Sequence, residues 1–226
     1  MQFSKSARKI WKTFFDLILP ADYNRRVLDG LSAEKFLALA EPARWQSAGQ
    51  EQANTLAIVN YKNRLVKQAV WSLKFKNNRA LAELFAAVIY DELKEELADL
   101  RLIANFSEPL LTPVPLARRR LNKRGYNQAE LIARHLAKLD QNNFFEYRKH
   151  ILKKIKDTLP QSQIKNKAQR LKNLKGCFTA VAPALIKNRN IILLDDVTTT
   201  GATLNEASRA LRRAGARQIF CVTLAH

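Results

Sequence analysis

The chain has 226 residues, 47% of them hydrophobic, and its 39 basic and 20 acidic residues give a formal net charge of +19. This length supports one sizeable α/β core with a smaller appended subdomain, and no apolar run approaches the roughly 20 residues that a membrane-spanning helix needs. Two cysteines argue against a disulfide framework, and the three scattered histidines predict no protein metal site.

The N-terminal segment combines basic residues with a short apolar run at 11–20. This combination raises the alternatives of a signal peptide or an amphipathic anchor. The run is short and no convincing cleavage site follows, so we expect a cytoplasmic protein that does not contact a membrane. Residues 1–50 are predicted to be largely helical, with a short helix over 32–39 capped by Ser32.

Strands and helices alternate in the rest of the chain. Strands are expected at 54–60, 110–114, 150–155, 177–181, 191–195 and 217–224. Helices are expected at 61–76, 79–97, 127–139 and 203–214. Within them, Trp71 and Phe75 are predicted to be core or packing residues rather than residues that stack on a ligand. Residues 156–169 lack apolar periodicity and are typical of a mobile loop over an active site. The alternation predicts an α/β protein with a mainly parallel sheet flanked by helices.

The most informative segment, 191–203, reads I-I-L-L-D-D-V-T-T-T-G-A-T. Its apolar part predicts a buried parallel strand, with Asp195 and Asp196 at the carboxyl end, where open α/β sheets bind ligands. Backbone N–H groups and hydroxyls of 198–203 can wrap a phosphate, Gly201 permits close approach, and the next helix adds a positive dipole end. Carboxylates repel phosphate, so the two aspartates suit neutral hydroxyls, such as those of a ribose. The segment therefore predicts a sugar-phosphate site, and it is not a P-loop because no G-K-[ST] follows the glycine.

A second segment, 113–128, reads P-V-P-L-A-R-R-R-L-N-K-R-G-Y-N-Q. Its first part predicts a strand end and a tight turn at Pro115, with a cis peptide bond as one option. Its second part predicts a cationic loop that leads into a helix. Backbone amides and guanidinium groups of this kind can hold a pyrophosphate. A further basic run at 148–175 contains a single acid, Asp157. The two runs favour anionic partners, either phosphorylated substrates or nucleic acid.

Three segments in this order resemble the ComF family of amidophosphoribosyltransferase-like competence proteins. They read Y-K-N-R-L-V-K-Q-A-V-W-S-L-K-F-K at 61–76, P-V-P-L…R-G-Y-N-Q-A-E-L at 113–131, and L-L-D-D-V-T-T-T-G-A-T-L at 193–204. A looser match, T-L-P-Q…R-L-K-N-L-K-G-C-F, covers 158–178. The 113–131 segment separates this family from purine and pyrimidine salvage enzymes that share the loop of the third segment.

The resemblance implies a type I phosphoribosyltransferase domain at 53–226, preceded by a helical segment at 1–52 in place of the family's zinc ribbon. It also implies phosphoribosyl pyrophosphate (PRPP) as the ligand, bound with Mg²⁺. Asp195 and Asp196 would bind the ribose hydroxyls and, with Arg124, form the catalytic set. The implied 5′-phosphate ligands are Thr198, Thr199, Thr200, Gly201, Ala202 and Thr203. The implied pyrophosphate ligands are Val114, Pro115, Leu116, Arg118 or Arg120, and Arg124. A lid over the site would carry Thr158, Gln161 and Arg170.

Two features depart from the family's pattern. Family members usually begin with cysteine pairs that bind zinc, whereas here Ser32 and Lys35 stand at two thiol positions and Asp22 lies near an earlier one. These residues cannot rebuild a thiolate site, so we expect the zinc to be lost. The family's usual arginine before the lid is replaced by Lys153 or Lys154, a point charge in place of a bidentate fork.

Three functions stay open at this level. The first is transfer of a phosphoribosyl group from PRPP to an unidentified acceptor. The second is a binding protein of the competence machinery that holds single-stranded DNA on its basic surface, with Tyr126 and Tyr147 as the nearby aromatics not expected in the core. The third is a PRPP sensor that keeps the loop but lacks catalysis.

Overall fold

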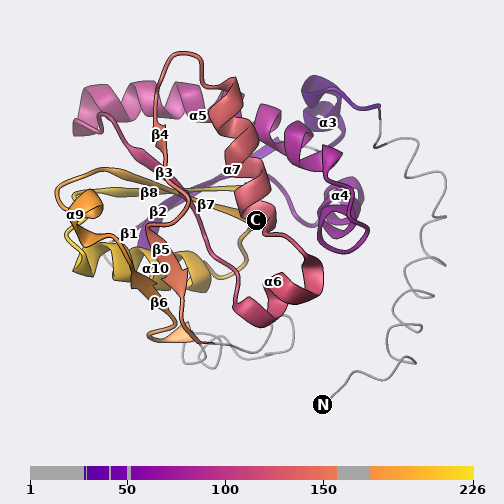
Figure 1. Cartoon of the computed structure of the whole chain (residues 1–226). Helices are drawn as coiled ribbons and strands as arrows, with labels where there is room; N and C mark the ends of the chain where they lie inside the picture. Colours follow the sequence, from indigo (N-terminus) through magenta and orange to yellow (C-terminus); the bar gives the residue numbers. More distant parts are fainter. Residues whose placement is uncertain (1–27, 29, 41, 50–51, 157–173) are drawn as a thin grey trace.

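The computed structural model describes residues 28, 30–40, 42–49, 52–156 and 174–226 (Figure 1). Its main sheet has six strands in the order β1-β2-β8-β7-β3-β4. The strands are β1 Pro42–Gly49, β2 Gln52–Val59, β3 Leu110–Pro113, β4 Glu146–Tyr147, β7 Ile191–Val197 and β8 Ile219–Ala225. β1 and β2 are antiparallel, and all other neighbouring strands are parallel. The predicted mainly parallel α/β sheet is therefore confirmed.

Helices cover both faces of this sheet (Figure 1). Successive side chains of a strand point to opposite faces, so Ile192 and Leu194 of β7 join the core formed with α5 (Ala80–Ala104) and α7 (Gln128–Leu139). Ile191 and Leu193 join the core formed with α10 (Ala202–Arg213). Burial on both faces explains why β7 begins as a continuous apolar run.

Two N-terminal helices pack against α5. The first, α3 (Ala33–Ala40), begins at the predicted cap, where the Ser32 hydroxyl accepts a hydrogen bond from the backbone N–H of Lys35 at 3.3 Å. The second, α4 (Arg64–Phe75), is capped by the side chain of Asn63 and buries one apolar face. The amide of Asn63 also donates to the carbonyl of Leu39 at 3.0 Å, which ties the start of α4 to the end of α3.

A second, two-stranded sheet stands apart from the first. β5 (Leu152–Lys154) pairs antiparallel with β6 (Phe178–Ala180), and the short helix α9 (Pro183–Ile186) follows. Both strands lie within the ranges expected from the sequence. In the sequence, residues 157–173 lie between the two strands and are not among the described residues. The predicted loop residues Thr158, Gln161 and Arg170 belong to this range.

The segment 42–49 corrects the expectation of a largely helical N-terminal region, because it forms β1. Its register with β2, which includes Trp45 opposite Ala57 and Ser47 opposite Thr55, comes from hairpin pairing. Such pairing follows neighbouring strands more than local propensity. The hairpin crosses the expected division of the chain at residue 52.

Two further differences concern helices. The expected cationic loop is in fact a helix, α6 (Arg118–Arg124), because its Arg, Leu and Lys residues favour helix. Gly125 ends α6 with a left-handed φ of 79°, as glycine does at many helix C-termini. The helix predicted to end at residue 97 extends to Ala104 and is closed by Asn105 with φ 50°. No helix in the described ranges is long and apolar enough to cross a membrane.

Candidate functional site

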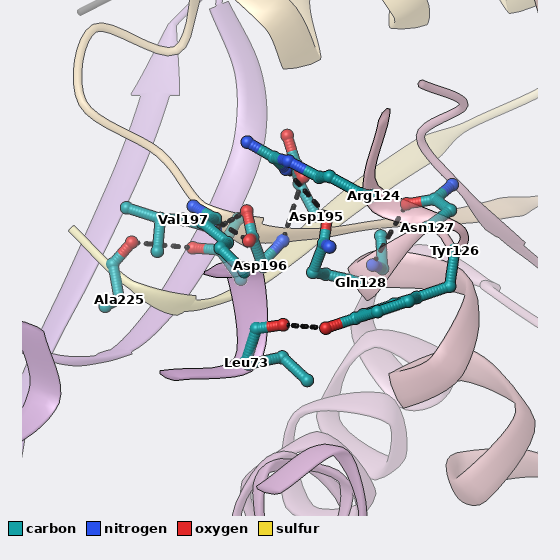
Figure 2. A network of polar contacts seen from close by, with 12 residues as sticks. Leu73, Arg124, Tyr126, Asn127, Gln128, Asp195, Asp196, Val197 and Ala225 are labelled. Carbon is teal, nitrogen blue, oxygen red and sulfur yellow. Dashed lines mark hydrogen bonds and ion pairs between the residues drawn. The ribbon is translucent and has the colours of Figure 1, made fainter. Parts of the chain in front are cut away.

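The two aspartates of the main motif lie near the end of strand β7, which extends to Val197 (Figure 2). Asp195 is half-buried, and Asp196 is 7% exposed. One carboxylate oxygen of Asp195 accepts from the backbone N–H of Asp196 at 2.9 Å, and one of Asp196 accepts from that of Val197 at 2.8 Å. These bonds orient both carboxylates at the carboxyl edge of the sheet.

A lysine that the sequence reasoning missed contacts this pair. Lys74, in the last turn of α4, places its Nζ 2.8 Å from Oδ2 of Asp196, with the two side chains only 21% and 10% exposed. A signal was present in the sequence, because Lys74 lies four residues after Val70 and therefore borders the buried face of an amphipathic helix. A lysine that borders a buried helix face is expected to have an anionic partner, and here the partner is Asp196 of β7.

Arg124 reaches the same place from α6. Figure 2 shows its side chain extending toward Asp195 and Asp196. Its guanidinium donates to the side-chain oxygen of Gln128 at 2.9 Å and lies 5.1 Å from the ring centroid of Phe75. Burial lowers the pKa of Arg124, while the charges of Asp196 and Asp195 act in the opposite direction. The structure thus brings Arg124 together with both predicted ribose-binding carboxylates.

Phe75, which was expected to be a core or packing residue, is 59% exposed and packs outside the core. Its ring lies 6.0 Å from that of half-buried Trp71, centroid to centroid, at an interplanar angle of 45°. The guanidinium of Arg124, which belongs to α6, lies over the Phe75 ring. The end of α4 therefore presents aromatic surface beside the carboxylates.

The threonine loop connects β7 to α10 as predicted. The backbone N–H of Thr198 donates to the carbonyl of Ala225 at 2.9 Å, which keeps the start of the loop in line with β8. Gly201 has a φ of 70° and is the N-cap of α10, where its carbonyl accepts from Asn205 at 2.8 Å. Since α10 begins at Ala202, its first N–H groups face the loop. The arrangement suits an anion at a helix N-terminus.

The loop's side chains differ in exposure. Thr198 and Ala202 are buried, Thr199 is exposed, and Thr200 and Thr203 are half-buried. The predicted phosphate ligands therefore share backbone N–H groups, whereas their hydroxyls differ in exposure.

The predicted pyrophosphate turn follows β3 beside the aspartates. The backbone N–H of Val114 donates to the carbonyl of Leu194 at 2.8 Å, and the carbonyl of Val114 accepts from the amide of Asn127 at 2.9 Å. The described residues contain no cis peptide bond, so the cis option for Pro115 is wrong. Pro115 and Leu116 are half-buried, and α6 then begins.

Arg118, Arg120 and Arg124, the three arginines of α6 that were expected to bind pyrophosphate, are not equivalent. Arg118 is exposed and Arg120 is half-buried, whereas Arg124 contacts Gln128 and Phe75 beside the two aspartates. One helical turn of arginines cannot direct every side chain to one point, because successive residues are rotated by about 100°. Of the two candidates to replace the family's arginine, Lys153 is exposed, whereas the charge of Lys154 acts on Asp195.

The remaining candidates are the two cysteines and the positions discussed for zinc. Cys177 and Cys221 are buried free thiols. No group of three or more His, Cys, Asp or Glu side chains with a metal-binding arrangement occurs in the described ranges. Asp22, the third position discussed for zinc, lies outside those ranges, and Lys35 is exposed.

Asp195 makes the stability of the protein depend on pH. Burial of the carboxylate and repulsion by Asp196 raise the pKa of Asp195 to about 7, against the attraction of Lys74. An unfolded aspartate has a pKa of about 3.9. The folded chain therefore holds the proton more tightly, and this contribution to stability is present below about pH 4 and is lost as the pH rises to about 7.

Asp195→Asn removes this titration. We expect the variant to gain free energy of unfolding relative to the unmodified chain between about pH 4 and pH 7, by at most about 1.4 kcal/mol per pH unit. Above about pH 8 the difference should stay constant. Urea denaturation across this range measures it. Parallel stability curves throughout would contradict the raised pKa.

Comparison with known proteins agrees with this geometry. Residues 121–226 match the phosphoribosyl transferase domain family. Competence protein F of Haemophilus influenzae is 34% identical over 157 residues, which are 69% of this chain and 63% of that protein. Competence protein ComFC of Streptococcus pneumoniae is 29% identical, covering 74% of this chain and 66% of that protein. The chain thus spans a little under two thirds of the length of these relatives.

Other similarities are more distant. The DNA utilization protein YhgH of Escherichia coli K12 is 25% identical over 81% of this chain and 74% of that protein. The similarity to a structure of the Bacillus subtilis glutamine PRPP amidotransferase covers 62% of this chain and 26% of that chain, with 18% identity and a TM-score of 0.33.

The parallel sheet, the aspartate pair and the glycine loop before α10 define an α/β protein of the type I phosphoribosyltransferase fold. Within that class, the chain belongs to the ComF family.

Proposed function

We propose that this protein binds PRPP with Mg²⁺ and transfers its phosphoribosyl group to an acceptor. The observation that carries the proposal is the pair Asp195 and Asp196 at the carboxyl edge of the sheet, directly before the Gly201 loop and α10. The carboxylates can accept hydrogen bonds from the ribose hydroxyls, and the nearby helix N-terminus can donate hydrogen bonds to the 5′-phosphate. Together they match the two ends of a ribose 5-phosphate.

Each part of the site has a role in this proposal. Asp195 and Asp196 bind the ribose hydroxyls, and residues 198–203 hold the 5′-phosphate. Arg124 and the backbone of 114–116 receive the pyrophosphate. As the bond between C1 and pyrophosphate breaks and the acceptor's lone pair forms a new bond to C1, negative charge gathers on the leaving group. Arg124 stabilises that charge, so the chain acts by positioning and electrostatics.

Magnesium fits the donor set of the site. Carboxylate oxygens are hard ligands, and Mg²⁺ is commonly held by one or two carboxylates together with substrate phosphates and waters. Asp195 and Asp196 are the residues that would hold it with PRPP. When bound, the ion supplies charge neutralisation for the diphosphate.

Thermal denaturation tests the proposal. PRPP with Mg²⁺ at one hundred times its dissociation constant should stabilise the fold by about 2.7 kcal/mol, which corresponds to a rise in melting temperature on the order of 5–10 °C. Ribose 5-phosphate, which lacks the diphosphate, should give a smaller rise. No rise with PRPP in a folded sample would contradict the proposal. A rise without pyrophosphate release for any nucleobase or amine would favour a PRPP sensor.

A second candidate is binding of single-stranded DNA in competence. It is favoured by the exposed cations Arg118, Arg119 and Lys123 on α6 and by the names of the relatives, two of which are competence proteins. Phosphate contacts release counterions, so the affinity for an oligonucleotide should fall steeply as salt increases. Filter binding measures this, and no affinity even at low salt would exclude the candidate.

A further inference from the structure

Three consecutive residues at the end of α4 each contact another part of the site. The backbone carbonyl of Leu73 accepts a hydrogen bond from the hydroxyl of Tyr126, as Figure 2 shows. The ammonium of Lys74 contacts Asp196 at 2.8 Å, and the ring of Phe75 lies under the guanidinium of Arg124. The two flanking contacts hold the helix end, so the position from which Lys74 extends is defined by the fold.

Lys74 and the sugar compete for the same carboxylate. One oxygen of Asp196 accepts from the backbone N–H of Val197, and the other lies against Lys74. A ribose hydroxyl that donates to Asp196 must therefore share the oxygen with the ammonium or displace it. Displacement leaves a largely buried cation in need of a new partner, since an unpaired buried charge is strongly unfavourable.

The substrate itself offers that partner. In PRPP the diphosphate is attached to C1, and C1 is bonded directly to C2, which carries one of the hydroxyls. A cation that leaves the carboxylate binding these hydroxyls is thus within reach of the diphosphate through a flexible four-carbon stem. The charges also favour the move, because Lys74 and Arg124 balance Asp195 and Asp196, and the diphosphate adds negative charge to the set.

We propose that Lys74 is a diphosphate-binding residue that exchanges Asp196 for the C1 diphosphate of the substrate. The inference rests on the proposed PRPP site and adds to it a ligand from α4, a helix outside the predicted pyrophosphate segment.

Calorimetry with two ligands tests the exchange. PRPP carries the diphosphate, whereas ribose 5-phosphate shares only the hydroxyls and the 5′-phosphate. Lys74→Gln should weaken PRPP binding at least about tenfold, because one charge-assisted contact is lost. The same variant should bind ribose 5-phosphate as well as the unmodified chain does, or better, because the competitor for Asp196 is gone. Lys74→Arg keeps the charge and should restore most of the affinity for PRPP.

Lys76→Gln is the matched control. It removes the same charge two residues further on, where the ammonium lies 4.9 Å from the ring of Trp71. It should leave both affinities unchanged. Unchanged PRPP binding in Lys74→Gln, or an equal loss for both ligands, would overturn the exchange while leaving the PRPP site intact. If the unmodified chain bound neither ligand, the proposed function itself would fail, and the inference with it.

Discussion

A chain in which Asp195 and Asp196 are both replaced by Asn is expected to lose PRPP binding while it remains folded. Charge-assisted hydrogen bonds contribute about 1.5–3 kcal/mol each, so losing two of them weakens binding by roughly 100-fold or more. The fold should persist with reduced stability. The amide oxygens can still accept from the backbone N–H groups of Asp196 and Val197, which lie 2.9 and 2.8 Å from the present carboxylates, but Lys74 loses its charged partner. Calorimetry with PRPP and Mg²⁺ measures the loss, and circular dichroism the folding.

The control for this variant removes a carboxylate elsewhere. The side chain of Asp91 on α5 is 63% exposed, and its Oδ1 lies 3.0 Å from Nζ of Lys94 on the same helix. Asp91→Asn changes the net charge in the same direction and should leave PRPP affinity unchanged. Affinity retained in the double variant would reject the assignment of both aspartates as ribose ligands.

Arg124→Met is expected to weaken binding of inorganic pyrophosphate by about 10–100-fold, since it removes a charge-assisted donor worth about 1.5–3 kcal/mol. The loss should be specific to pyrophosphate and PRPP, because Arg124 faces the carboxylates from the side of α6 and is held there by Gln128 and Phe75. Methionine keeps an apolar stem over the Phe75 ring, so the packing at this point changes little. Calorimetry with pyrophosphate and Mg²⁺ measures the effect.

Lys123→Met provides the comparison for Arg124→Met. Lys123 is the preceding residue of α6, is exposed, and carries the same charge. If both variants lost affinity equally, the basic character of α6 as a whole would be responsible. If neither lost affinity, the pyrophosphate would have to bind elsewhere.

Several features of the site were accessible from the sequence because they are local. The apolar run at 191–194, the two aspartates and the glycine follow one another along the chain, and their order alone predicts strand, ligand edge and helix N-terminus. The same holds for Ser32 as a helix cap and for Val114 and Arg124 around the second segment. Each of these predictions depends on residues that lie close together in the sequence.

Other features escaped prediction because they depend on distant contacts. β1 is a strand because it pairs with β2. The arginine-rich segment is a different case: its helix follows from local propensity and ends at Gly125, and its high polarity led to the expectation of a loop. For Phe75 the sequence left core and peripheral packing open, since the apolar face of a helix does not reveal where its last turn leaves the packed interior. The structure exposes the ring beneath Arg124.

The sequence by itself determined the fold class and the family, and it singled out two segments as candidate binding sites, because local patterns of apolar periodicity and ligand chemistry are enough for these predictions. Only the tertiary structure decided which charges meet. Lys74 and Asp196 are more than 100 positions apart in the chain, and they touch because α4 ends where β7 reaches the edge of the sheet. Such a contact depends on how helices pack against a sheet, and no spacing within either segment specifies it.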